Sequence, residues 1–212
     1  MEKVSVNRRK RGRPPKDQKG FNDTRAALIR AGLEVLTEKG FVSSSIDEIL
    51  KKVSVPKGSY YHYFGSKEDF GRVLVDNYIS FFAHKIEKAL NNESLSPLER
   101  LRAFVADAAG GMERYDFKRG CLIGNMGQEI AVIPESFREQ LQSGFELWQK
   151  LVAGCLKDAQ DLGEISESAD CLYLAGVFWI GWEGAVMRTR IEKNADPLFN
   201  FADFFISGIE KH

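Results

Sequence analysis

The stretch 45–67 limits what this chain can fold into more than any other part of it. Ser45 and Glu48 have the spacing of a capping box, in which each side chain binds the backbone N–H of the other residue at a helix start. Apolar residues then recur at helical spacing until Pro56, whose fixed φ angle and missing N–H favour a turn. The segment from there to Phe64 suffices for about two turns of helix. The pattern therefore predicts two short helices joined by a tight turn.

The second of these helices has an unusual outward face. At the helical angle per residue, Tyr60 and Phe64 fall on one edge and are expected to be buried, which leaves His62 pointing away beside Gly58 and Ser59. Flat and hydroxyl-bearing groups on an exposed helix suit the major groove of DNA, which a helix-turn-helix enters with its second helix. The alternative is an ordinary helical hairpin with aromatic residues on its surface.

The same residues resemble a known signature. The segment 58–70 is similar to the G-T-L-Y-x-Y-F-x-x-K-E-x-L pattern of TetR/AcrR-type transcriptional regulators, and 40–49 resembles that family's G-[FY]-x-x-T-[ST]-[VI]-x-x-I. Tyr60 stands where Leu is usual and Ser45 where Thr is usual, and both substitutions keep the role of the side chain. The resemblance implies a helix-turn-helix DNA-binding domain followed by a helical domain for ligand binding and dimerisation.

The resemblance also implies roles for single residues. Positions that face DNA in the family are matched here by Lys57, Gly58, Ser59, Tyr61, His62 and Tyr63. Positions that contact phosphate are matched by Ser44, Ser45 and Lys67. We therefore expect these nine side chains to form the surface that meets double-stranded DNA.

Charge is unevenly distributed along the chain. Residues 1–75 hold 16 Lys and Arg against 9 Asp and Glu, whereas residues 76–212 hold 14 against 21, so the basic half is expected to meet a polyanion. The first twenty residues lack apolar periodicity and are expected to be disordered. Within them, Arg11 and Arg13 belong to an R-G-R-P segment that resembles an AT-hook and would suit a narrow minor groove. The alternative is an incidental basic tail.

Further helices follow from apolar periodicity and from start and stop signals. We expect helices at 23–39 with Asp23 as the cap, from Ser66 to about 86, from 98 to about 111, from Pro134 to about 156, from 166 to 191, and from 196 onward. No strand alternation is visible, so the predicted fold is all-α. The expected parts are a basic arm at 1–20, a helix-turn-helix domain at 21–67 and a regulatory and dimerisation domain at 68–212.

The expected helix 166–191 is apolar nearly all round. Its small residues Gly176, Gly181, Gly184 and Ala185 would let another helix approach closely, and the final helix is rich in aromatic residues. These features predict a symmetric homodimer, which the family resemblance also implies, and a dimer would read a palindromic operator. The alternative is that both helices fill the core of a monomer.

A regulator that responds to a signal needs a site for a small-molecule inducer. The predicted lining of that site comprises Phe117, Cys121, Met126, Glu129, Phe145, Trp148, Phe178, Trp179, Trp182, Glu183, Met187 and Arg188. Lys118 and Arg119 are expected to lower the thiol pKa of Cys121, which would make it reactive toward electrophiles or oxidants. The G-C-L-x-G-N segment is similar to that of TetR-type regulators answering acrylate, quinones or aldehydes. The alternative is an inert, packed thiol.

Other functions have little support in the sequence. Cys121 as the nucleophile of an enzyme lacks a histidine partner, no cofactor is expected, and the three histidines have no spacing typical of metal ligands. An odd cysteine count and the lack of a signal peptide or a long apolar run favour a cytoplasmic, nucleoid-associated protein and no membrane. The sequence thus predicts a ligand-responsive repressor, and an activator or an architectural DNA-binding protein stays open as the alternative.

Overall fold

Helices make up nearly all regular structure in the computed structural model, which describes residues 18–211. Within that range the chain forms α1 (Gln18–Lys39), α2 (Ile46–Val53), α3 (Lys57–Tyr60), α4 (Lys67–Leu90), α5 (Pro97–Glu113), α6 (Leu122–Gln128), α7 (Ser136–Asp161), α8 (Cys171–Glu192) and α9 (Asp196–Ile209). No strand forms among these residues, and a single backbone bridge joins Ile165 to Glu210. The predicted all-α fold is confirmed.

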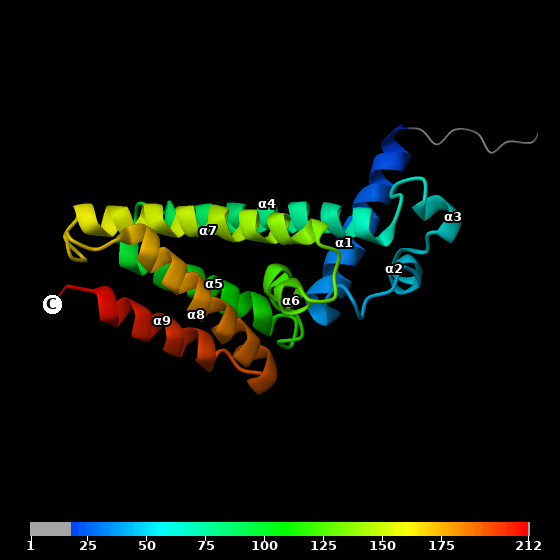
Figure 1. The fold of residues 1–212 in the computed structure, drawn as a ribbon. Helices are drawn as coiled ribbons and strands as arrows, with labels where there is room; N and C mark the ends of the chain where they lie inside the picture. Colours follow the sequence, from blue (N-terminus) through cyan, green and yellow to red (C-terminus); the bar gives the residue numbers. More distant parts are fainter. Residues whose placement is uncertain (1–17, 212) are drawn as a thin grey trace, which may run out of the picture.

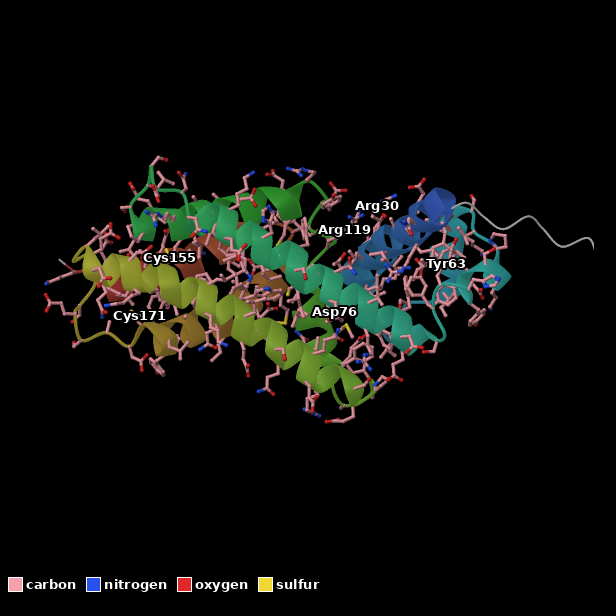
Figure 2. The ribbon with its side chains drawn as sticks, turned by 90° about the horizontal axis from the view of Figure 1, so that it is seen from above. Arg30, Tyr63, Asp76, Arg119, Cys155 and Cys171 are labelled. Atoms are coloured by element: carbon pink, nitrogen blue, oxygen red, sulfur yellow. The ribbon has the colours of Figure 1, made fainter. Side chains whose placement is uncertain are left out.

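The helices divide into a small head and a longer bundle (Figure 1). The head consists of α1, α2 and α3, and α4 runs from it along the bundle, side by side with α7 (Figures 1 and 2). The helices α5, α8 and α9 complete the bundle, and the short α6 contacts α1, α4 and α7. The helix α6 therefore lies where the head meets the bundle. None of the helices among residues 18–211 is long and apolar enough to cross a bilayer.

The start of α2 and the turn after it have the local geometry that the sequence predicts. Ser45 Oγ accepts a hydrogen bond from the Glu48 N–H at 3.1 Å, although the Glu48 carboxylate binds Lys39 Nζ at 2.5 Å instead of closing the capping box. Ser54 ends α2 in the left-handed region at φ 52°. The second helix is shorter than predicted, because α3 covers one turn and continues to Phe64 only as a hydrogen-bonded turn.

The core of the head is aromatic. Tyr60 and Phe64 are buried as predicted, and the Phe64 ring lies 4.5 Å from that of Phe70 between centroids. The Tyr60 hydroxyl donates to the Ser66 carbonyl at 3.1 Å, so its polar end has a partner, and burial raises the pKa of Tyr60 well above its usual value. This packing fixes α3 against the start of α4.

Two helix starts differ from the prediction. The helix α1 begins at Gln18, five residues before the predicted cap Asp23. This earlier segment packs through Phe21, whose ring lies 4.5 Å from that of Tyr63. The helix α8 begins at Cys171 rather than at residue 166, because Asp170 is the residue that caps it, accepting from the Tyr173 N–H at 3.0 Å.

One further helix, α6, and the starts of α5 and α7 also differ from the prediction. The helix α6 was not predicted, since seven residues with two glycines show no apolar stripe. The helix α5 begins at Pro97 because Ser96 and Glu99 form a cap, in which the Glu99 carboxylate accepts from the Ser96 N–H at 2.9 Å. The helix α7 begins two residues after Pro134, at Ser136.

Candidate functional site

The outward face of the second helix and the turn after it is exposed. Lys57, Gly58 and His62 are exposed, Tyr61 keeps 52% of its surface accessible, and Ser59 and Tyr63 are half-buried. Lys57 Nζ lies 3.0 Å from Asp47 Oδ1, so this cation is already paired within the head. The side chains predicted to face DNA thus lie together on one surface, with flat rings and hydrogen-bonding groups.

Gly58 has no internal reason to be glycine. A Cβ built at this position meets no other atom within 4 Å, and its backbone is not in the left-handed region. Glycine costs a helix about 1 kcal/mol relative to alanine. A requirement for glycine at this position would therefore come from a close approach by a molecule outside the chain.

Ser44 and Lys67, predicted to contact phosphate, bind groups within the head. The buried Ser44 hydroxyl donates to the Phe41 carbonyl at 2.7 Å. Lys67 Nζ donates to the Ser44 carbonyl at 2.7 Å and lies 4.6 Å from the centre of the Phe41 ring. Ser45 is exposed and its hydroxyl caps α2. Arg11 and Arg13 lie outside the described residues.

Side chains from the bundle bind the last turn of α1. A helix leaves its final carbonyls without partners inside the helix. Here Asn125 Nδ2 of α6 donates to the Thr37 carbonyl at 3.0 Å, and Arg190 Nη2 of α8 donates to the Glu38 carbonyl at 2.7 Å. Arg190 Nη1 also donates to Asn125 Oδ1 at 3.0 Å, which joins the two contacts. The bundle therefore supplies partners for the Thr37 and Glu38 carbonyls at the end of the first head helix.

The loop between α1 and α2 is bound in the same way. Glu129, at the end of α6, accepts hydrogen bonds from the backbone N–H groups of Phe41 at 2.7 Å and Val42 at 3.3 Å. Gly40 precedes them at φ +80°, and a Cβ there would collide with the Glu129 carboxylate. The position of this loop is thus set by a carboxylate from the bundle.

A cavity of about 280 Å³ lies at this junction, between the end of α1, α6 and α8. Its lining comprises Glu38, Lys39, Gly40, Cys121, Asn125, Gln128, Glu129, Glu183, Val186, Met187 and Arg190. Four of the predicted ligand-binding residues, Cys121, Glu129, Glu183 and Met187, are among them. Asn125 and Arg190 were not predicted, because only the fold brings their polar groups to the end of α1.

A buried acidic cluster forms one wall of the cavity. The Cys121 thiol lies close enough to the Glu183 carboxyl group and the Tyr78 hydroxyl for the three groups to affect one another's pKa values. Burial raises the pKa of Glu183 to about 7, and burial next to Glu183 raises the pKa of Cys121 well above its usual value. The predicted lowering of the thiol pKa is therefore wrong. Lys118 instead pairs with Asp116 at 3.0 Å, and Arg119 pairs with Glu34 at 2.8 Å.

The other predicted ligand-binding residues do not line this cavity. Met126 is fully buried, Phe117 occupies a left-handed turn after α5, and Arg188 lies with Met187 along a shallow groove between α8 and α9. The aromatic residues pack on one another, with the Trp148 ring 4.8 Å from Phe82 and 5.3 Å from Trp179 between centroids. Phe145, Phe178 and Trp182 belong to the same cluster. Within residues 18–211, no group of three His, Cys, Asp or Glu side chains could hold a metal ion.

The architecture has close counterparts among known proteins. Residues 28–71 match the family model of bacterial regulatory proteins of the tetR family, and residues 97–205 match that of tetracyclin repressor-like C-terminal domains. The chain belongs to the TetR family. As a TetR-family protein it is a DNA-binding transcription regulator, and the resemblance that the signature at 58–70 indicates is confirmed.

Relatives of this TetR-family chain match it over most of its length. It is 48% identical to the transcriptional regulator AcuR of Cereibacter sphaeroides over 92% of this chain and 89% of that protein. It is 32% identical to the repressor DhaR of a Mycobacterium species, over 84% of this chain and 87% of that protein. A solved TetR regulatory protein from Rhodobacter sphaeroides superposes with a TM-score of 0.85 at 48% identity, over 87% of this chain and 97% of that one.

Proposed function

We propose that this TetR-family chain is a homodimeric repressor that binds a palindromic operator and releases it when a small molecule occupies the cavity between α1, α6 and α8. DhaR of Mycobacterium and NemR of Escherichia coli are named repressors, which favours repression over the alternatives of activation or an architectural role. In this proposal the exposed face of α3 and the turn after it reads the DNA, and the protein works in the cytoplasm.

One observation carries the proposal. The residues that hold the head, Asn125, Glu129 and Arg190, are also residues of the cavity lining. A ligand that binds there contacts the same side chains whose hydrogen bonds set the position of α1 and of the loop to α2, and in this proposal it displaces or reshapes those bonds. A ligand shifts the equilibrium between two conformations only if it binds them with unequal affinity. Since the lining residues also hold the head, the affinity of the cavity for a ligand depends on the position of the head.

Dimerisation has support in the surfaces of α8 and α9. Ile180 is 78% exposed and Phe204 is 82% exposed, so large apolar side chains lie outside the core on both helices. Gly184 has no other atom within 4 Å of a built Cβ, whereas Gly181 already faces Phe201 within the same chain. An open glycine between exposed apolar side chains fits a helix of a second copy.

The experiment starts from a DNA sequence selected out of a random duplex pool. Fluorescence anisotropy should give saturable binding to a selected palindrome, and light scattering should give the mass of two chains in the absence of DNA. A library of small molecules is then screened for release. Binding to every duplex alike, or a monomeric mass at micromolar concentration, would refute the proposal.

A reactive electrophile is a second candidate for the inducer. Cys121 lines the cavity, and a solved structure of NemR from E. coli is described as the reduced form, which points to redox chemistry in that relative. The raised pKa of the thiol opposes fast reaction. N-ethylmaleimide should release the operator from the wild type but not from Cys121→Ser, and equal release from both would exclude this candidate.

A further inference from the structure

We propose that Glu183 is the residue by which the cavity selects its ligand, and that the ligand presents a cationic N–H group, an ammonium or an amidinium, to this carboxylate. The inference rests on the proposed function only for the consequence of binding. The binding itself follows from the cavity and its charges.

Glu183 is the cavity residue whose buried polar atom lacks a partner. Its Oε1 is enclosed and accepts no hydrogen bond. An unsatisfied buried acceptor destabilises the protein, and more so when it is charged. An arriving N–H donor would remove that cost, so the cavity gains most from a ligand that donates at this atom.

The other charged groups of the lining are already engaged. Lys39 binds Glu48, Arg190 binds the Glu38 carbonyl, and Glu129 accepts from the head loop. The Glu38 carboxylate accepts from Arg119 at 3.3 Å. The lining therefore holds three carboxyl groups against two cations. Glu38 pairs with Arg119 and Glu129 accepts from backbone N–H groups, whereas the enclosed Glu183 Oε1 has no partner. This balance favours a cationic ligand over an anionic one.

The neighbouring backbone makes room for this carboxylate. Gly124 of α6 lies against Glu183, and a Cβ at Gly124 would collide with Glu183 Oε2. Glycine lowers the stability of a helix, so Gly124 makes α6 less stable than alanine would at this position. The absence of a side chain at Gly124 lets the Glu183 carboxyl group lie close to the α6 backbone.

Affinity for a cation should rise with pH. Burial raises the pKa of Glu183 to about 7, so the anion that attracts the ligand becomes dominant above neutrality. The titratable and charged groups around it are Tyr78 of α4, Cys121 and Glu129 at the ends of α6, Glu38 and Lys39 of α1, and Arg190 of α8 itself. Burial raises the pKa values of Tyr78 and Cys121, so both stay neutral between pH 6 and pH 8. An anionic ligand would show the opposite pH trend.

The test uses three probes of matched size: benzylammonium, benzyl alcohol and benzoate. Isothermal titration calorimetry at pH 8 should show benzylammonium binding at least tenfold more tightly than the other two. Between pH 6 and pH 8 its affinity should rise about tenfold, as the ionised fraction of Glu183 does. Benzoate binding as tightly as benzylammonium, or equal binding of the alcohol, would overturn the proposal.

Two variants locate the effect. Glu183→Gln should abolish both the preference for benzylammonium and its pH dependence, whereas Glu192→Gln, on the exposed end of the same helix, should keep both. Gly124→Ala displaces the carboxylate without removing it and should weaken benzylammonium at least tenfold, with folding checked by circular dichroism. Retained preference in folded Glu183→Gln would contradict the role of this residue.

The same protein samples separate the inference from the proposed function. Operator binding by anisotropy is measured with each probe present. If benzylammonium binds through Glu183 and leaves the operator complex intact, the ligand site stands and release by that ligand fails. If no probe binds while the selected operator still does, the site inference fails and DNA binding stands.

Discussion

At the scale of single residues, replacing Gly58 should change the stability of the fold and the affinity for DNA in opposite directions. Gly58→Ala meets no atom within the protein and should stabilise the fold by up to about 1 kcal/mol, since alanine favours a helix. The added methyl group on a surface that approaches DNA should weaken operator binding at least tenfold. Melting curves and anisotropy measure the two effects. Gly110→Ala, at an equally open position on α5, is the control and should leave DNA binding unchanged.

The raised pKa of Glu183 predicts how the free energy of unfolding depends on pH. Its pKa is about 7 in the folded protein and near 4.5 when unfolded, so the folded state binds the proton more tightly and loses stability as pH rises from about 4.5 to 7. Glu183→Gln removes this loss. The variant should match the wild type near pH 4.5 and exceed it at pH 8, by up to about 3 kcal/mol. Urea unfolding at several pH values measures this, and a constant difference would contradict the buried-acid origin.

At the scale of elements, α6 and the end of α8 hold the head. Arg190→Met keeps an apolar stem but leaves the Glu38 carbonyl and Asn125 Oδ1 without this donor, which should cost about 1–3 kcal/mol. Amide exchange at Gly40 and Phe41 should accelerate, as read by mass spectrometry or NMR. Arg188→Met, two residues earlier on the same helix, should leave exchange in the head unaltered. Equal acceleration in both variants would argue against a role for Arg190 in holding the end of α1.

The helices that the sequence predicts are those marked by capping residues and by apolar residues at helical spacing. Ser45 and the apolar spacing behind it locate α2, and Asp196 before an aromatic stripe locates α9. The helix α6 was missed because its stability comes from packing of Leu122, Ile123 and Met126 in the core, not from propensity. Tertiary contacts, rather than residues 122–128 alone, decide that this segment is helical.

The cavity was only partly readable for a related reason. Aromatic residues at helical spacing, such as Trp148 and Trp179, were expected to line it, but rings of that size pack on each other in the bundle core. The polar groups that line it come from three helices distant in the sequence, and Arg190 acquires its role only by reaching α1. Glu183 and Cys121 could be predicted as lining residues from their chemistry. Asn125 and Arg190 line the cavity only because the fold brings them to the end of α1.

At the scale of the whole molecule, the outer surfaces of α8 and α9 predict the assembly. Phe204→Glu places a charge at an apolar side chain that is 82% exposed, so the monomer should stay folded while the dimer dissociates. Operator affinity should fall at least tenfold because two linked heads bind more tightly than one. Light scattering and anisotropy measure both. Leu162→Glu, 69% exposed at the turn after α7, should affect neither.

The binding of the last α1 carbonyls by side chains of the bundle has a consequence for protein engineering. Grafting this head onto a foreign sensor would leave the Thr37 and Glu38 carbonyls, and the amides of Phe41 and Val42, without the groups that bind them here. A working chimaera should therefore carry Asn125, Glu129 and Arg190 at matching positions of the recipient. The head therefore depends on residues of α6 and α8, which lie inside the range 97–205 that the C-terminal family model matches.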